Sequence, residues 1–114
     1  MAGKQINLKV SIAKAISFLK KHFDIKEVIL FGSQLSKKTD EWSDIDLIVI
    51  SPDFKGKSYE EIVQTFAELA LKFTPNIEVH PYTPDDLKDA RPTNFLGHIL
   101  QIGKIVYRNG KLLI

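Results

Sequence analysis

The sequence predicts an α/β (α+β) domain in which helices flank a small mixed central sheet. Three observations support this fold class. Apolar residues recur at helical spacing in three segments, and short apolar or alternating segments suited to strands lie between them. The length of 114 residues favours one domain that spans residues 1–114.

The first half begins with a helical pattern, because Ile12, Ile16, Leu19 and Phe23 recur at i, i+4, i+7 and i+11. The segment 28–31 is wholly apolar, which indicates a strand buried on both faces. The elements predicted here are, in order, a helix from about 7 to 23, a strand at 28–31, a short helix to about 38, a loop at 39–43 and a strand at 44–50.

The second half contains one strand between helices and then a hairpin. Ser58 and Glu61 form a capping-box pattern before an amphipathic helix that Pro75 and Asn76 end. Residues 77–82 alternate and predict a strand. The remaining predictions are a helix capped by Thr83 with Pro84 at its first position, a last helix from Thr93 or Asn94 to Gly103 with Phe95, Ile99 and Ile102 inward, and a hairpin at 105–114 around Asn109-Gly110.

The composition excludes several classes of protein. The chain has no cysteine, which excludes thiolate metal sites and fits a reducing compartment, so we expect a cytoplasmic protein. No apolar run approaches the roughly 20 residues of a membrane span, so no membrane partner is expected. No basic stripe suited to duplex binding is present, so no nucleic-acid partner is expected either.

Charge is unevenly distributed along the chain, although the net charge is only +2. Residues 39–90 carry twelve acids against four lysines, whereas the segments on both sides are basic. Two interpretations stay open. The pattern is either ordinary solvation of helix faces or an acidic centre that attracts metal beside a basic segment that tolerates phosphate.

Two carboxylates stand two residues apart on the predicted strand at 44–50. Asp44 and Asp46 therefore leave the same face, while Ile45 and Leu47 leave the other and can enter the core. A divalent cation relieves the repulsion between neighbouring carboxylates, and oxygen ligands of this kind suit Mg²⁺. The Asp-x-Asp pattern alone is a weak motif, because it also occurs by chance.

A Gly-Ser pair follows the buried strand at 28–31. Gly32 allows the backbone to approach a ligand closely, and the hydroxyl of Ser33 adds a donor to the free N–H groups of a helix start, which favour phosphate. On its own the pair is more often a plain turn.

The two patterns together resemble a known family. Leu30-Phe31-Gly32-Ser33, nine intervening residues and Ser43-Asp44-Ile45-Asp46-Leu47 are similar to the signature of the minimal nucleotidyltransferases of the DNA polymerase β superfamily. The leading helix, a later strand with an acid, and the terminal pattern of Ile99, Leu100, Gly103 and Tyr107 are also similar. The resemblance covers nearly the whole chain and implies a polymerase β-type nucleotidyltransferase fold.

The resemblance implies a metal site. Asp44 and Asp46 would hold Mg²⁺, or Mn²⁺, that bridges the triphosphate. The family's third carboxylate matches Glu78, which would be a metal ligand or a base for the acceptor hydroxyl. His80 shares a strand face with Glu78. Its role is either structural or functional, and a lone histidine in a small domain favours the structural interpretation.

The resemblance also implies a nucleotide site at Gly32, Ser33 and Ser43. Many members of the family have glycine where this chain has Lys37. We include Lys37 among the nucleotide-binding residues, since lysine is a usual phosphate ligand. A lysine in solvent, or a site that has lost activity, are the alternatives.

We therefore expect a nucleotidyltransferase that moves a nucleoside monophosphate from a nucleoside triphosphate, ATP in the first instance, to a hydroxyl group. The resemblance implies a separate helical partner of the HEPN type, which carries the acceptor, and an antitoxin role. The alternative function is a non-catalytic module that binds nucleotide or partner and neutralises the partner by contact. Self-association of the chain also stays open.

Overall fold

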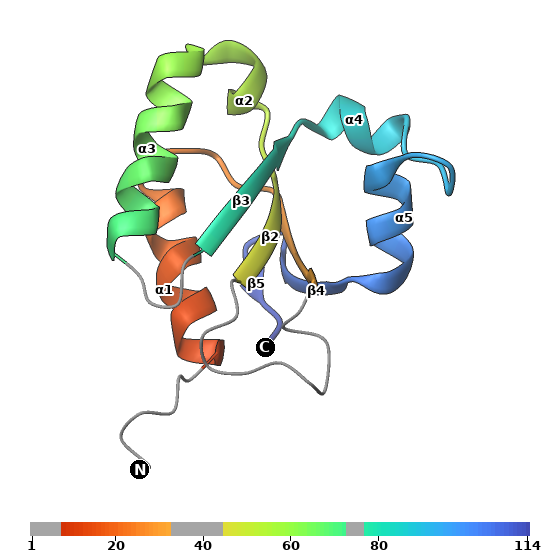
Figure 1. Cartoon of the computed structure of the whole chain (residues 1–114), viewed down its shortest axis with the longest axis horizontal. Helices are drawn as coiled ribbons and strands as arrows, with labels where there is room; N and C mark the ends of the chain where they lie inside the picture. Colours follow the sequence, from red (N-terminus) through yellow and green to blue (C-terminus); the bar gives the residue numbers. More distant parts are fainter. Residues whose placement is uncertain (1–7, 33–44, 73–76) are drawn as a thin grey trace.

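A five-stranded mixed sheet forms the centre of the molecule in the computed structural model, which describes residues 8–32, 45–72 and 77–114 (Figure 1). The strand order is β3-β2-β1-β4-β5. β2 and β3 pair in parallel, whereas the other neighbours pair antiparallel. The strands are β1 (Glu27–Phe31), β2 (Ile45–Ile50), β3 (Ile77–Tyr82), β4 (Lys104–Arg108) and β5 (Lys111–Leu112).

Helices cover both faces of this sheet, with α1 and α3 on one side and α4 and α5 on the other (Figure 1). This arrangement confirms the predicted α/β fold. None of the helices in the described ranges is both long enough and apolar enough to cross a membrane. The helices are α1 (Leu8–Lys20), α2 (Asp53–Gly56), α3 (Tyr59–Lys72), α4 (Pro84–Lys88) and α5 (Phe95–Ile102). The short helix near 38 and the loop at 39–43 that the sequence predicts lie outside the described residues.

The larger of two cores lies between the sheet and the pair α1 and α3. Alternate residues of β1, β2 and β3 point into it, because side chains alternate across a strand. From β2, for example, Leu47 and Val49 enter this core and are fully buried. The helical pattern that predicted α1 is confirmed here, since Ile12, Ile16 and Leu19 are all buried.

The smaller core lies on the opposite face, under α5. Ile29, Ile48 and Ile50 of the sheet pack there against Leu96 and Ile99. The predicted inward face of this helix was wrong in part, because Phe95 and Ile102 are about half exposed, at 49% and 55%.

Gly97 accounts for this difference in the orientation of α5. Gly97 packs so closely on the backbone of Arg91 that a Cβ atom would have no room. The helix therefore turns Leu96, Gly97 and Ile99 toward the protein, and Phe95 and Ile102 toward its sides.

One short helix, α2, was not predicted. The sequence predicts no element between the strand at 44–50 and the capping box that begins at Ser58. The hydroxyl of the buried Ser51 accepts a hydrogen bond from the Asp53 amide at 3.1 Å and helps to start the turn. Phe54 then packs edge-on against Phe23 and Phe66, with ring centroids 5.0 and 5.8 Å away. Because these contacts join residues far apart in the sequence, no local pattern predicts α2.

The predicted helix caps and the hairpin turn are confirmed. The Ser58 hydroxyl accepts a hydrogen bond from the Glu61 amide at 3.2 Å, and Thr83 forms a reciprocal capping box with Asp86. Both Asn109 and Gly110 have positive φ, at 50° and 82°. This conformation is the one that a two-residue hairpin turn requires.

Candidate active site

Strand pairing brings the end of β1 next to the first polar residues of β2 and β3, at one end of the sheet. β1 pairs with β2 so that Phe31 lies opposite Asp46, and β3 pairs with β2 so that Glu78 lies beside Asp46. Gly32 follows Phe31 directly, so the end of β1 also lies at this position. The end of β1 at Gly32 therefore lies on one side of Asp46, and Glu78 lies on the other.

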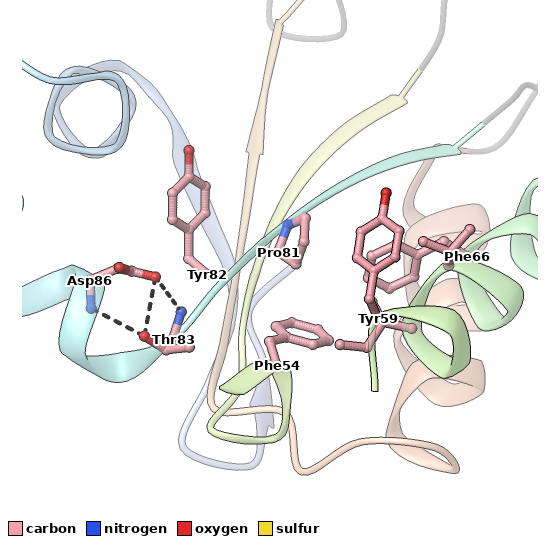
Figure 2. Close-up of a pocket in the computed structure, with 9 residues that line it drawn as sticks. Phe54, Tyr59, Phe66, Pro81, Tyr82, Thr83 and Asp86 are labelled. Atoms are coloured by element: carbon pink, nitrogen blue, oxygen red, sulfur yellow. Dashed lines mark hydrogen bonds between the residues drawn. The ribbon is translucent and has the colours of Figure 1, made fainter. Parts of the chain in front are cut away.

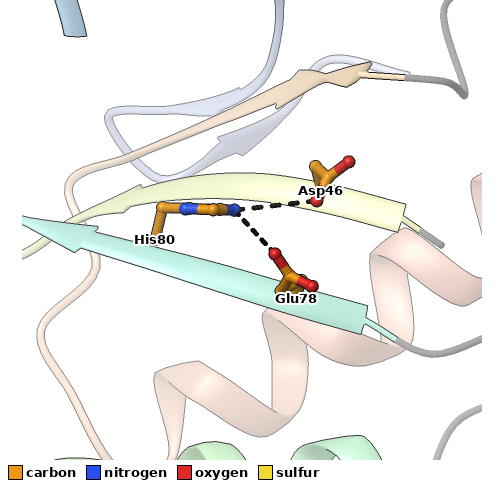
Figure 3. Close-up of side chains that lie close together, drawn as sticks. All are labelled: Asp46, Glu78 and His80. Atoms are coloured by element: carbon orange, nitrogen blue, oxygen red, sulfur yellow. Dashed lines mark ion pairs between the residues drawn. The ribbon is translucent and has the colours of Figure 1, made fainter. Parts of the chain in front are cut away.

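His80 lies on the same strand face as Glu78, two residues further along β3, and its ring reaches toward both carboxylates (Figure 3). The Nε2 atom lies 3.4 Å from the Glu78 Oε1 atom and 3.6 Å from the Asp46 Oδ1 atom. One ligand atom from each of the three side chains lies within 4.8 Å of the others. The cluster thus presents two carboxylates and one imidazole to a common point.

Aromatic rings hold the imidazole of His80 in place. Its ring centroid lies 5.1 Å from that of Phe31 and 6.2 Å from that of Phe95. The two phenylalanines also contact each other edge-on, at 5.7 Å. The Nε2 atom is buried and has no hydrogen-bond partner in the described part of the chain. A buried polar atom normally has such a partner, so this one marks a position suited to a ligand.

Both the backbone conformation at position 32 and the neighbouring Asp46 side chain require glycine there. The φ of Gly32 is +85°, in the region where side chains other than glycine are strained. A Cβ atom at this position would also collide with the carboxylate of Asp46. The sequence predicts Gly32 as a site residue because glycine lets the backbone approach a ligand closely; in the structure the group that comes close to it is the Asp46 carboxylate.

The structure brings together three of the residues that the sequence predicted for the site, Gly32, Asp46 and Glu78. Glu78 has the predicted orientation, since its side chain is 56% exposed while Ile77 is buried. The other four predicted residues lie in the segment 33–44, outside the described residues; they are Ser33, Lys37, Ser43 and Asp44.

Sequence reasoning undervalued His80. Its shared face with Glu78 was visible in the sequence, because the two residues are separated by one position on a strand. The register of β3 against β2 was not visible; it places Glu78 beside Asp46 and His80 beside Ile48, from where the imidazole reaches the Asp46 carboxylate. The aromatic packing that aims the ring at the carboxylates was not visible either.

The donor set fits a divalent cation. Carboxylate oxygens suit Mg²⁺ and Mn²⁺, and an imidazole nitrogen is a usual ligand of transition metals. Neighbouring ligands of one ion, each bound at about 2.0–2.2 Å, lie roughly 2.8–3.6 Å apart. The separations of 3.4 and 3.6 Å around the Nε2 atom fall within this range.

A separate apolar cavity of about 390 Å³ lies at the far end of β3, between this strand and α3 (Figure 2). Partial burial, and then the nearby carboxylate of Asp86, raise the pKa of the Tyr82 phenol at its rim. Because Tyr82 is four residues beyond Glu78, the two sites are about 13 Å apart along the strand. The lining residues are Phe54, Tyr59, Ile62, Val63, Phe66, Pro81, Tyr82, Thr83 and Asp86.

Comparison with known proteins agrees with this architecture. The family described as "Polymerase beta, Nucleotidyltransferase" matches residues 13–111. A crystal structure of a candidate nucleotidyltransferase from Sulfolobus solfataricus is similar over 99% of this chain and 91% of that chain, with a TM-score of 0.65 and 13% sequence identity. At this identity the likeness concerns the fold alone. A search of curated proteins finds no match.

Proposed function

Because the chain belongs to the polymerase β nucleotidyltransferase family, we propose that it transfers a nucleoside monophosphate from a nucleoside triphosphate, preferably ATP, to a hydroxyl group, with Mg²⁺ or Mn²⁺. The observation that carries the proposal is the pairing of Asp46 with Glu78 beside the glycine turn at Gly32. A carboxylate pair next to a backbone turn suits a metal and a triphosphate held together.

The metal, when bound, supplies positive charge that stabilises the attacking and leaving oxygens of an in-line displacement. In our proposal Asp46 and Glu78 hold it together with Asp44, which lies outside the described residues. The buried Nε2 atom of His80 and the mutual approach of the two carboxylates support this placement. The glycine at position 32 keeps the space that the Asp46 carboxylate needs.

In the proposed reaction the acceptor oxygen forms a bond to the α-phosphorus of the triphosphate. The bond from that phosphorus to the bridging oxygen breaks, and pyrophosphate leaves. The proton that the acceptor hydroxyl loses would pass to Glu78, whose carboxylate is more than half exposed and has a second oxygen besides the one that faces His80. Gly32, Ser33, Lys37 and Ser43 are assigned to the phosphates.

We propose that the acceptor is a protein hydroxyl, of Tyr, Ser or Thr, on a helical HEPN-type partner, and that the chain acts as an antitoxin. The exposure of Glu78 supports an acceptor that arrives from another molecule. The partner would position its hydroxyl against the nucleotide. Such positioning lowers the barrier by about 7–11 kcal/mol in favourable cases, so we expect transfer by the chain alone to be slow.

The test compares ATP labelled at the α-phosphate with ATP labelled at the γ-phosphate. Each is incubated with Mg²⁺ and the chain, with and without a HEPN-type protein encoded beside it. We expect label in the partner only from the α-phosphate, and a mass increase of one AMP. Fast transfer to an unrelated small alcohol by the chain alone would contradict the partner-dependent reaction. Tight binding of a partner without any labelling would support the contact-only module instead.

A further inference from the structure

We propose that His80 is a protein ligand of the metal, and that the resulting site prefers a transition-metal ion such as Co²⁺ or Mn²⁺ over Mg²⁺. This inference rests on the metal dependence of the proposed function and specifies the metal. The family resemblance implies only carboxylates. The nitrogen donor is a feature of this chain, read from the geometry at His80.

The Nε2 atom of His80 is placed where a metal ligand is needed. It lies between the two carboxylates, 3.4 Å from one and 3.6 Å from the other, as Figure 3 shows. The atom is buried although the side chain as a whole is 30% exposed, and it has no hydrogen-bond partner in the residues that the structure describes. A cation shared with Asp46 and Glu78 would satisfy it.

The imidazole ring of His80 is held in this orientation before any ligand binds. Phe31 ends β1 and Phe95 begins α5, and both rings pack against the imidazole. Because these aromatic contacts restrict the imidazole ring, the His80 side chain loses less conformational freedom when a metal binds. A site whose ligands are already oriented binds more tightly than one that must be assembled.

The types of ligand at this site also decide which metal it prefers. Mg²⁺ takes oxygen ligands almost exclusively and keeps several waters. Imidazole suits the later first-row metals, whose affinity for mixed nitrogen and oxygen sites rises from Mn²⁺ through Co²⁺ and beyond. Two carboxylates with one imidazole therefore shift the preference of this site away from Mg²⁺.

The experiment measures Co²⁺ and Mg²⁺ affinity of the full chain by isothermal titration calorimetry, without nucleotide. We compare the wild type with His80→Gln, and with His80→Phe, which keeps a ring between the two phenylalanines. The control is His22→Gln, because His22 also packs between two phenylalanines, Phe18 and Phe23. Circular dichroism checks that each variant is folded.

We expect the wild type to bind Co²⁺ more tightly than Mg²⁺. Both His80 variants should lose about 10- to 100-fold in Co²⁺ affinity, a range typical of damaged metal sites, and far less in Mg²⁺ affinity. His22→Gln should change neither. Pulsed electron paramagnetic resonance of bound Mn²⁺ should show coupling to a ¹⁴N nucleus in the wild type and lose it in His80→Phe.

The outcomes separate this inference from the proposed function. If Co²⁺ and Mg²⁺ both bind but the His80 variants keep the wild-type ratio of affinities, the nitrogen ligand is wrong and the carboxylate site stands. The same holds if the ¹⁴N coupling persists in His80→Phe. If neither metal binds the wild type, with or without ATP, the metal-dependent function fails as well.

Discussion

The two faces of the sheet carry different kinds of side chain, although the same strands build both. On the face covered by α1 and α3, β2 contributes only fully buried aliphatic side chains: Ile45, Leu47 and Val49. On the opposite face β2 begins with a carboxylate, Asp46, and continues into the smaller core. β3 repeats the pattern, with Ile77 packed on the first face and Glu78 on the second.

This difference shows how a small protein can accommodate a polar site that lowers the stability of its fold. Carboxylates held close together repel one another, and a stable fold has to outweigh that repulsion. Here the face on the α1 and α3 side carries the larger of the two groups of buried apolar side chains. Since neighbouring residues of one strand belong to opposite faces, single substitutions can separate the two roles.

The largest effect is expected for Asp46→Asn. The amide keeps the shape of the side chain but removes its charge, so metal binding should be lost and transfer should fall at least about 10³-fold, roughly 4 kcal/mol of transition-state stabilisation. The free energy of unfolding without metal should stay within about 1 kcal/mol of wild type, because the amide preserves the shape of the side chain and removes its repulsion with the Glu78 carboxylate.

The matched control is Asp89→Asn, the same change at an exposed acid after α4. Metal affinity comes from calorimetry, the transfer rate from α-labelled ATP, and stability from urea unfolding. Equal metal affinity in Asp46→Asn and wild type would remove Asp46 from the site. A large loss of stability without metal would make it a structural residue instead.

The next largest effect is expected one residue further on, at Leu47. Its side chain is fully buried in the larger core. Leu47→Ala should lower the free energy of unfolding by about 3 kcal/mol, the usual cost of a cavity left by a buried leucine. Metal affinity of the folded variant, measured at low temperature, should change less than about threefold.

Leu71→Ala is the control for the cavity, since Leu71 on α3 is 88% exposed. It should cost less than about 0.5 kcal/mol. A Leu47 variant that loses metal affinity while it stays folded would mean that the two faces are coupled, and the division between them would be less sharp than the packing indicates.

Local patterns in the sequence predicted most of the elements of this fold. The spacing of apolar residues identified α1 and α3, and the alternation of Ile77, Glu78 and Val79 identified β3 and its polar face. The spacing of apolar residues did not predict the features that specific packing contacts determine. The turn of α2 depends on Phe54 against Phe23 and Phe66. The orientation of α5 depends on the close approach of Gly97 to the backbone of Arg91, which apolar spacing does not reveal.

The candidate site divides in the same way. Asp46 and Glu78 could be selected from the sequence, because each sits on a strand between residues that face the core. Their contact could not, since it depends on the parallel register of β2 and β3 across the intervening helix α3. The importance of His80 depended on two phenylalanines from β1 and α5, which no local spacing brings together.

The smallest effect is expected for Gly32→Ala. This substitution tests the contact between the Gly32 backbone and the Asp46 carboxylate. Two costs apply at this position. Alanine at a φ of +85° is strained by about 1–2 kcal/mol. Its Cβ atom would also displace the Asp46 carboxylate. We therefore expect a modest loss of stability together with a loss of metal affinity of about tenfold, in the range seen when the support of a metal ligand is removed.

Gly110→Ala separates the two costs, because Gly110 has nearly the same φ of +82° but nothing within 4 Å of an added Cβ atom. It should lose a similar amount of stability, read from urea unfolding, and keep wild-type metal affinity in calorimetry. If Gly32→Ala also keeps its metal affinity, the Asp46 carboxylate can move aside without harm, and glycine is needed there only for the turn. If it loses affinity while Gly110→Ala does not, the space that Gly32 leaves for Asp46 is itself part of the metal site, and the end of β1 belongs with the polar face on β2 and β3.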